Sequence, residues 1–307
     1  MRNLPAMKHP PHYSVPARSR GLKPAYKGRM EGRLIPACLA GALFLALALP
    51  TAYGWGREGH VIVARIAEDH LTSQAKAGIA ALLGAQSSIA GDAVANWADD
   101  IRPHRRESKT WHYVNIPFGA DHYDAKRDCP PAGCVVDRIG HFARVLADKK
   151  AGQETRVEAL KFLVHFVGDV HQPLHCIERD NDRGGNECTV IFFHEVRNLH
   201  WIWDDELIRR RMHLYPDPIA FADRLDKRIT ATQTAEFTKG DAASWAGESH
   251  RAAREVAYAG VPTTRIKPPL AEDYVRHCGP VAENLLMKAG LRLARMLNTA
   301  FEGEHSR

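Results

Sequence analysis

The chain has 307 residues, of which 45% are hydrophobic and 25% charged, so it has the composition of a globular protein with enough apolar side chains for one large core. The first 54 residues hold eight of the 42 Lys and Arg residues and one of the 36 Asp and Glu residues. Residues 55–307 therefore hold 34 basic and 35 acidic side chains, a net charge of −1. This balance excludes a general positive field for attracting nucleic acid, and any bound phosphate must be held locally.

The N-terminal 54 residues have the pattern of a secretory signal peptide. Basic residues come first, the stretch from Leu34 to Leu49 is almost wholly apolar, and Ala52 and Gly54 are small residues before a cut at Trp55. Sixteen apolar residues are short for a spanning helix. We therefore expect export to the periplasm or medium, no stable membrane association, and a mature domain over 55–307; Met30 is an alternative start.

Five cysteines follow the leader. An exported protein can form disulfides, and the nearest pairs along the sequence are Cys129–Cys134 and Cys176–Cys188, which leaves Cys278 without a partner. Both pairings are hypotheses from spacing alone.

Most of the mature chain has helical periodicity, which predicts an all-α class with a single domain. Thr72 is typical of a helix N-cap and Gly84 of a helix end. Strand patterns are limited to 113–116 and 189–194, the second of which predicts a short hairpin. The predicted helices are 59–71, 72–84, 90–100, 137–149, 154–170, 199–213, 218–231, 241–258 and 271–302.

The segment 162–175 has the highest density of chemically active side chains. His165 and Asp169 are four residues apart, so they share one face of a helix. Pro173 ends that helix, and His175 follows in the next loop. Imidazole and carboxylate groups that converge within ten residues are typical of a Zn²⁺ site.

His200 and Asp204 repeat the four-residue spacing, and His213 and Asp217 do so again. Prolines at 216 and 218 spoil a helix at the last pair, so we interpret it as a chance match. Taken alone, each remaining pair is more typical of an ordinary helix-face contact than of a metal site. The same holds for the upstream candidates, each of which has a plain structural interpretation: His60, Asp99 and His112.

Taken together and in order, these segments resemble one family. Trp-Gly-x-x-Gly-His begins at residue 55, and Trp-Ala-Asp, Trp-His-Tyr, His-Phe-x-Gly-Asp-x-His-Gln-Pro-Leu-His, Gly-Gly-Asn and Asn-Leu-His-x-x-Trp-Asp follow. The chain resembles the zinc-dependent, single-strand-specific nucleases and 3′-nucleotidases of fungi, plants and bacteria, the S1/P1 nuclease family. The resemblance implies a metal cleft in the all-α fold shared with zinc phospholipase C.

The resemblance also implies three zinc ions and assigns their ligands. The first ion takes Asp99, His112, His165 and Asp169. The second and more exposed ion takes His175, His200 and Asp204. The third takes His60, shares Asp169, and binds the α-amine and carbonyl of Trp55, which requires cleavage before Trp55.

For catalysis, the resemblance places Asp99 where it orients the attacking water and Arg102 beside the scissile phosphate, although Arg102 considered alone is a solvated loop arginine. Tyr113 and Asn115 match positions that stack on and hydrogen-bond a nucleobase. Gly184-Gly185-Asn186 resembles the loop that lines the same cleft, and a plain turn before 189–194 is the alternative. The implied activity is hydrolysis of single-stranded DNA and RNA to 5′-phosphate products, with 3′-nucleotides as further substrates and a monomeric enzyme.

Two other functions stay open at this point. A zinc-dependent phospholipase C shares the fold and three zinc ions, but that family usually ends its ligand set with Glu, where this chain has Asp204. A non-catalytic, exported zinc-binding protein is the other alternative, and binding of zinc without phosphoesterase turnover would identify it.

Overall fold

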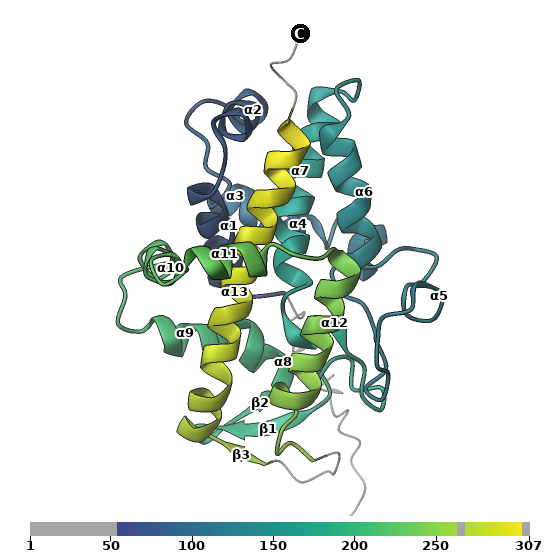
Figure 1. Cartoon of the computed structure of the whole chain (residues 1–307). Helices are drawn as coiled ribbons and strands as arrows, with labels where there is room; N and C mark the ends of the chain where they lie inside the picture. The colour runs from purple at the N-terminus through teal and green to yellow at the C-terminus, as the bar shows by residue number, and fades with distance from the viewer. Residues whose placement is uncertain (1–53, 263–267, 303–307) are drawn as a thin grey trace, which may run out of the picture. The chain divides into compact units, whose positions relative to one another are not determined.

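The computed structural model describes residues 54–262 and 268–302, which belong to one compact unit. The predicted leader and the alternative start at Met30 lie outside these residues. The described part is mainly helical with one small sheet, as predicted (Figure 1). In chain order the helices and strands are α1 Arg57–Asp69, α2 Ser73–Leu83, α3 Asp92–Ala95, α4 Trp97–Ile101, the 3₁₀ turn η1 Arg106–Thr110, α5 Ala125–Asp128, α6 Val135–Ala147, α7 Gln153–Asp169, the 3₁₀ turn η2 Pro173–Cys176, β1 Thr189–Phe192, β2 Glu195–Asn198, α8 Leu199–Trp201, the π-helical turn η3 Ile202–Glu206, α9 Leu207–Met212, α10 Pro218–Asp226, α11 Ala231–Phe237, α12 Ala242–Ala252, the π-helical turn η4 Ala253–Ala257, β3 Pro269–Leu270 and α13 Glu272–Phe301.

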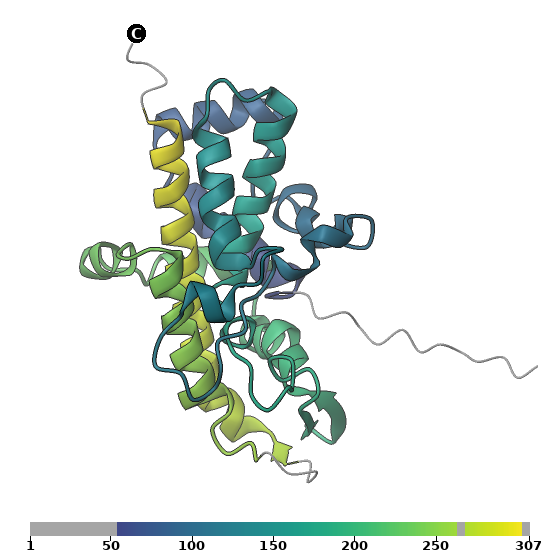
Figure 2. The same cartoon turned by 90° about the vertical axis from the view of Figure 1, so that its right-hand side faces the viewer.

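The core is built around α1, α7 and α13. α6 packs along α7, and α13 packs against α1, α6 and α7, so these helices lie side by side in both views (Figures 1 and 2). α1 and α13 approach closely at Gly290, where a Cβ atom would lie 2.5 Å from Ile66 Cγ2. The C-terminal half of α7 is buried on all sides, as expected for a helix at the centre of a core. This central position fixes His165 and Asp169.

Side-chain caps mark where several helices begin. Thr72 accepts a hydrogen bond from the Ala75 amide, as its sequence position predicts. Asp217 caps α10, whose first residue is Pro218. Capping boxes at Thr230–Gln233 and Asp241–Ser244 start α11 and α12.

The small sheet has the order β2–β1–β3. β1 and β2 form the predicted hairpin, joined by a two-residue turn in which both Phe193 and His194 have positive φ, the geometry of a type I′ turn. β3 adds a short parallel pairing that the sequence pattern did not predict. The β1–β2 hairpin leads directly into α8 and η3, which bear His200 and Asp204.

Three expectations about secondary structure are wrong. The predicted helix 90–100 is two short helices broken at Asn96, whose backbone leaves helical values at φ −106° and ψ 0° while its side chain donates to the Arg57 carbonyl and to Asp92. The predicted helix 218–231 ends at Asp226, and the separately capped α11 was missed. The predicted strand 113–116 is irregular, and the isolated bridge Pro117–Glu178 lies just beyond it, because the neighbouring segment is the turn η2 and the loop after it.

Of the two proposed disulfides, Cys129–Cys134 is present, with an S–S bond of 2.12 Å, and precedes α6. The pairing Cys176–Cys188 is wrong, because both residues are free. Cys176 is buried with its thiol against the carbonyl of Val170, whereas Cys188 lies beside Arg179.

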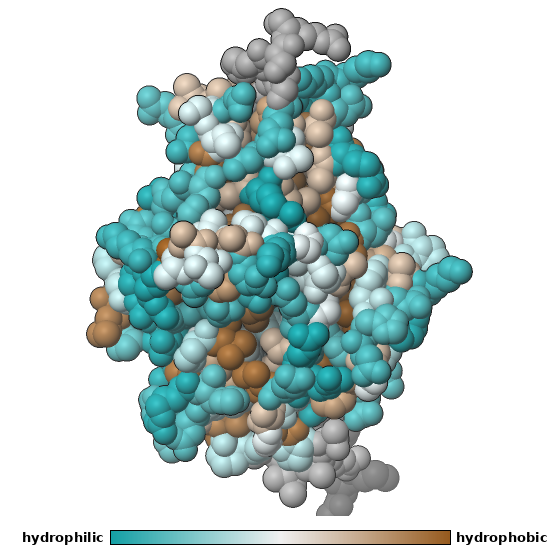
Figure 3. Space-filling model, in the orientation of Figure 1, coloured by the Kyte–Doolittle hydropathy of each residue, from teal (hydrophilic) through white to brown (hydrophobic). Residues whose placement is uncertain are grey.

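Hydrophilic residues cover most of the face seen in Figure 3. Among the described helices, none is both long enough and apolar enough to cross a bilayer.

Candidate metal centre and cleft

The eight side chains predicted as metal ligands come together in one cluster. They are His60 from α1, Asp99 from α4, His112 from the loop after η1, His165 and Asp169 from α7, His175 from η2, His200 from α8 and Asp204 from η3. All eight are at least 95% buried. Such a set is far more polar than a core tolerates without strong compensating interactions.

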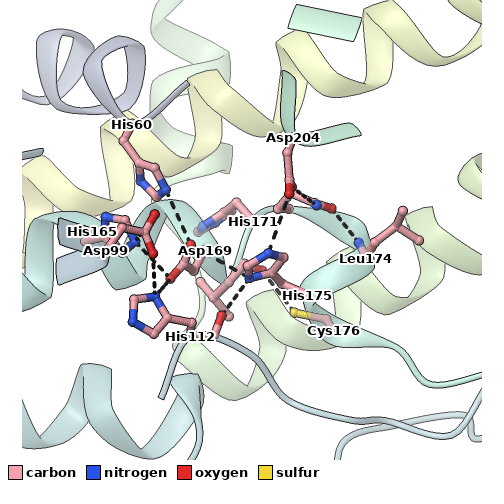
Figure 4. A network of polar contacts seen from close by, with 12 residues as sticks. His60, Asp99, His112, His165, Asp169, His171, Leu174, His175, Cys176 and Asp204 are labelled. Carbon is pink, nitrogen blue, oxygen red and sulfur yellow. Dashed lines mark hydrogen bonds and ion pairs between the residues drawn. The ribbon is translucent and has the colours of Figure 1, made fainter. Parts of the chain in front are cut away.

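Asp169 lies at the centre of this cluster (Figure 4). Its carboxylate oxygens lie 3.4 Å from His60 Nε2, 3.0 Å from His112 Nδ1 and 3.4 Å from His165 Nε2. Its Oδ1 also lies 3.8 Å from His175 Nδ1. Asp169 therefore connects the two parts of the cluster, the inner group around α7 and the outer group at the cleft.

The inner group contains His60, Asp99, His112, His165 and Asp169. The His60 ring stacks on the His165 ring with 3.8 Å between centroids. Asp99 lies 3.5 Å from His112 Nδ1 and 3.5 Å from His165 Nε2. The outer group contains His175, His200 and Asp204, with 3.4 Å between His200 Nε2 and Asp204 Oδ2 and 4.0 Å between His175 Nε2 and Asp204 Oδ1. Ligand atoms within 4.8 Å of one another form three sets: His60, Asp99 and His165; His112, His165 and Asp169; and His175, His200 and Asp204.

Backbone carbonyls fix three of the rings. His165 Nδ1 donates to the carbonyl of Ala95, His175 Nδ1 to that of His112, and His200 Nδ1 to that of Gly184. A carbonyl can only accept, so each Nδ1 carries a proton, and in the neutral ring the Nε2 lone pair faces the cluster. Metal-binding histidines are typically oriented in this way.

Several polar atoms of the cluster are buried without a hydrogen-bond partner in the described part of the chain. They are both ring nitrogens of His60, Nε2 of His112, His165, His175 and His200, and Oδ1 of Asp99 and Asp169. Buried polar atoms without partners are rare and costly. Nitrogen and carboxylate ligands in this number fit Zn²⁺, since Mg²⁺ and Ca²⁺ prefer oxygen alone.

Two of these rings already have the protonation that metal binding requires, whereas His165 and Asp204 must each lose a proton to bind a metal ion. Burial lowers the pKa of His60 to about 4 and that of His200 to about 3, so both rings are neutral at pH 7. Burial also opposes the charged form of His165, but Asp169 and Asp99 raise its pKa to about 9. Burial raises the pKa of Asp204 well above its usual range, so this carboxyl needs a nearby cation to stay ionised.

A cleft of about 600 Å³ opens onto the outer group. His175 and His200 lie in its wall, as do all five residues predicted to act on or bind substrate: Asp99, Arg102, Tyr113, Asn115 and Asn186. Arg102 is not a freely solvated side chain. It forms an ion pair with Asp99 at 3.9 Å and donates to the carbonyl of Lys109.

The segment before α1 lies against the inner group. Gly54 is buried, and a Cβ atom on it would overlap Asp169 Oδ1 and lie 2.9 Å from His60 Nε2. Trp55 is fully buried, and the Gly56 amide donates to the Asp204 carbonyl at 2.8 Å. The backbone at the predicted cut thus lies next to the predicted ligands of the third ion.

Comparison with known proteins identifies the family. The family model described as S1/P1 nuclease matches residues 55–302. Nuclease S1 of Aspergillus oryzae is 33% identical over 285 residues, covering 87% of this chain and 97% of that protein. The chain belongs to the S1/P1 nuclease family.

Two further relatives agree. Endonuclease 2 of Arabidopsis thaliana is 31% identical, covering 84% of this chain and 94% of that protein. Nuclease P1 of Penicillium citrinum is 29% identical, covering 80% of this chain and 97% of that protein. As a member of the S1/P1 nuclease family, the chain is a hydrolase that acts on ester bonds of nucleic acid.

The family motifs did not reveal every residue of the site. Gln172 is fully buried, donates to Asp204 Oδ1 and accepts from the Leu174 amide. It therefore orients Asp204, one of the predicted ligands. Its position between the motif residues His171 and His175 is the sequence feature that could have revealed it. His171 is in the same motif but bonds the Val167 carbonyl and Arg292, away from the cluster. His213 is exposed and Asp217 caps α10, so neither belongs to the site.

Proposed function

We propose that this S1/P1 family member is an exported, monomeric nuclease with three zinc ions that hydrolyses single-stranded DNA and RNA to 5′-phosphate products and removes phosphate from 3′-nucleotides. One observation supports this most strongly. The buried Nε2 atoms of His60, His165, His175 and His200, which have no hydrogen-bond partner in the described part of the chain, converge with three carboxylates beside the cleft.

In this proposal the inner group holds two zinc ions and the outer group one. Asp99, His112, His165 and Asp169 hold the first, and His175, His200 and Asp204 the second. His60, Asp169 and the terminal amine and carbonyl of Trp55 hold the third. Bound zinc would supply positive charge to the phosphate oxygens and lower the pKa of an attacking water.

The chain's own residues then place the substrate. The Arg102 guanidinium, held at the cleft wall by Asp99 and the Lys109 carbonyl, binds the scissile phosphate and stabilises its added negative charge. Asp99 accepts a hydrogen bond from the attacking water. The Tyr113 ring stacks on a base, while Asn115 and Asn186 hydrogen-bond its edge. Stacking favours unpaired bases because a paired base hides its face.

The test is metal analysis and a substrate panel on protein that begins at Trp55. We expect close to three zinc ions per chain, loss of activity with EDTA, faster cleavage of single strands than of duplex, and 5′-phosphate ends. Products with 3′-phosphate ends would contradict the proposed orientation. Turnover of phosphatidylcholine in place of nucleic acid would indicate a phospholipase, and zinc without turnover a binding protein.

Cleavage directly before Trp55 is a separate part of the proposal. Gly54 is packed against Asp169 and His60, so hydrolysis of the bond that follows it would leave the new amine near both side chains. An amide nitrogen is a poor ligand because its lone pair is delocalised, whereas a free amine has a pKa of about 8 and binds zinc readily. Protein with one extra residue before Trp55 should contain about one zinc ion fewer and lose most turnover. Full zinc content and full activity in that protein would refute the assignment.

A further inference from the structure

One wall of the cleft presents cations that the proposed function leaves without a role. Arg106 and Lys109, both on η1, line the cleft together with Arg102 and with Arg183 from the facing loop. Four of the lining residues are basic, whereas two, Asp99 and Glu178, are acidic. Asp99 belongs to the metal cluster, so the cleft is positive although residues 55–307 have a net charge of −1.

The geometry of η1 places two of these cations side by side. Arg106 and Lys109 are three residues apart in a 3₁₀ turn, in which side chains at this spacing eclipse each other. Both are exposed, and neither forms an ion pair within the described part of the chain. Arg105 behaves differently, because it is paired with Glu158 at 2.7 Å and Glu107 at 3.1 Å.

Arg106 and Lys109 are also separate from the metal cluster. Arg102 forms an ion pair with Asp99. Burial is the main cause of the lowered pKa of His175 and of His200, and the positive charge of Arg102 lowers both pKa values further. No hydrogen bond or ion pair joins Arg106 or the Lys109 side chain to the eight cluster residues over the described ranges. The Lys109 backbone, by contrast, accepts from Arg102. The cation pair therefore continues the cleft wall beyond the arginine proposed for the scissile phosphate.

We propose that Arg106 and Lys109 form a second phosphate subsite, which binds a backbone phosphate of the strand other than the one being cleaved. This inference rests on the proposed nuclease function. Its ligand is a single strand with at least two phosphates, so the subsite makes the enzyme prefer polymers over dinucleotides and 3′-mononucleotides. Two cations side by side can both contact one phosphodiester group, whose charge is shared between its two free oxygens.

The test compares R106Q/K109Q with a control that removes the same charge elsewhere, K76Q/R251Q, whose residues are exposed on α2 and α12 and do not line the cleft. The kcat/KM of each zinc-loaded protein is measured on decathymidylate and on the thymidine dinucleotide, which has one phosphodiester. Salt dependence is recorded for both, with zinc content and melting temperature as checks.

For R106Q/K109Q we expect kcat/KM on decathymidylate to fall by about 2- to 30-fold at low salt, with the dinucleotide unchanged. The slope of log(kcat/KM) against log[salt] should become shallower by about 0.7 for each phosphate that the variant no longer neutralises. K76Q/R251Q should match the parent. An equal fall on both substrates, or no fall on either, would overturn the proposal.

Binding separates this proposal from the proposed function. The affinity for a fluorescent, phosphorothioate-linked decathymidylate, which keeps every charge and resists hydrolysis, should fall in R106Q/K109Q and stay unchanged in the control. If that contrast appears while the parent hydrolyses no strand, the nuclease proposal fails and the subsite stands. If the parent hydrolyses strands and the contrast is absent, the subsite fails alone.

Discussion

The inner group and the cleft wall are built in different ways. The inner group takes four of its five side chains from helices α1, α4 and α7, and the core buries them. The cleft wall comes from η1, the chain around Tyr113 and Asn115, and the loop 178–187, where several residues have positive φ. Helices in a core have few alternative positions, whereas loops depend on a few hydrogen bonds. Changes in the first region should therefore affect metal content and stability, and changes in the second should affect substrate handling alone.

The largest effect should come from Asp169→Asn. The amide cannot balance the charge near His60, His112 and His165, so we expect loss of at least one zinc ion and a fall in turnover of about 10³-fold or more. Zinc analysis and kinetics on single-stranded DNA check this. Asp226→Asn, which breaks a carboxylate–imidazole pair with His70 outside the site, is the matched control and should keep zinc and turnover.

Arg102→Ala tests the cleft wall next to the metal. An interaction of this kind with the transition state is worth about 2–4 kcal/mol, so kcat should fall about 30- to 1,000-fold while zinc content stays at the parent level. Arg105→Ala serves as the control, since that arginine is paired with Glu158 and Glu107. Unchanged kinetics for Arg102→Ala would make it an ordinary loop residue.

Tyr113→Ala should have a smaller effect. Base stacking contributes about 1–3 kcal/mol, and its removal should appear mainly as a higher KM on single strands. Tyr113→Phe keeps the stacking face and should behave like the parent. A fall in zinc content for Tyr113→Ala would contradict the separation of the two regions, because Tyr113 is not among the predicted ligands.

The smallest effect on turnover should come from His171→Leu, next to the ligands in sequence but outside the cluster. It leaves the Arg292 guanidinium without its imidazole partner, so unfolding free energy should fall by about 2–3 kcal/mol with zinc content unchanged. Thermal melting and metal analysis check this, and loss of zinc would refute it.

His171 also predicts a change in acid stability. Burial and then Arg292 lower its pKa to about 3, below the value near 6.5 of an unfolded histidine. The neutral ring therefore stabilises the fold above pH 6.5, and this contribution falls by about 1.4 kcal/mol per pH unit as the pH drops toward 3. His171→Leu should show a shallower decline of stability over that range.

The difference between the regions also explains what the sequence predicted. The spacings His165–Asp169 and His200–Asp204 predicted that each pair of candidate ligands shares one face of a helix, since side chains four residues apart in a helix lie on the same side. The helices with ordinary caps, such as α2 at Thr72, were also predictable. The break at Asn96 was not, because it depends on contacts with Arg57, 39 residues away.

The cleft was less predictable for the same reason. The resemblance supplied Tyr113, Asn115 and Asn186, but periodicity predicted a strand at 113–116, since the local pattern cannot show which chain lies beside it. Gly184 has φ of 62°, and a Cβ there would collide with the Leu174 carbonyl. This packing allows its own carbonyl to orient His200, a relation between distant segments that spacing does not encode.

The contact between α1 and α13 joins the first and last described helices at Gly290. Until the ribosome has made the final thirty or so residues, α1 lacks the surface that covers it, and closing so long a loop is slow compared with forming local helices. Late closure would suit the export that we propose, in which the chain crosses a membrane before it folds. The same contact that completes the core would delay folding until the whole chain is available.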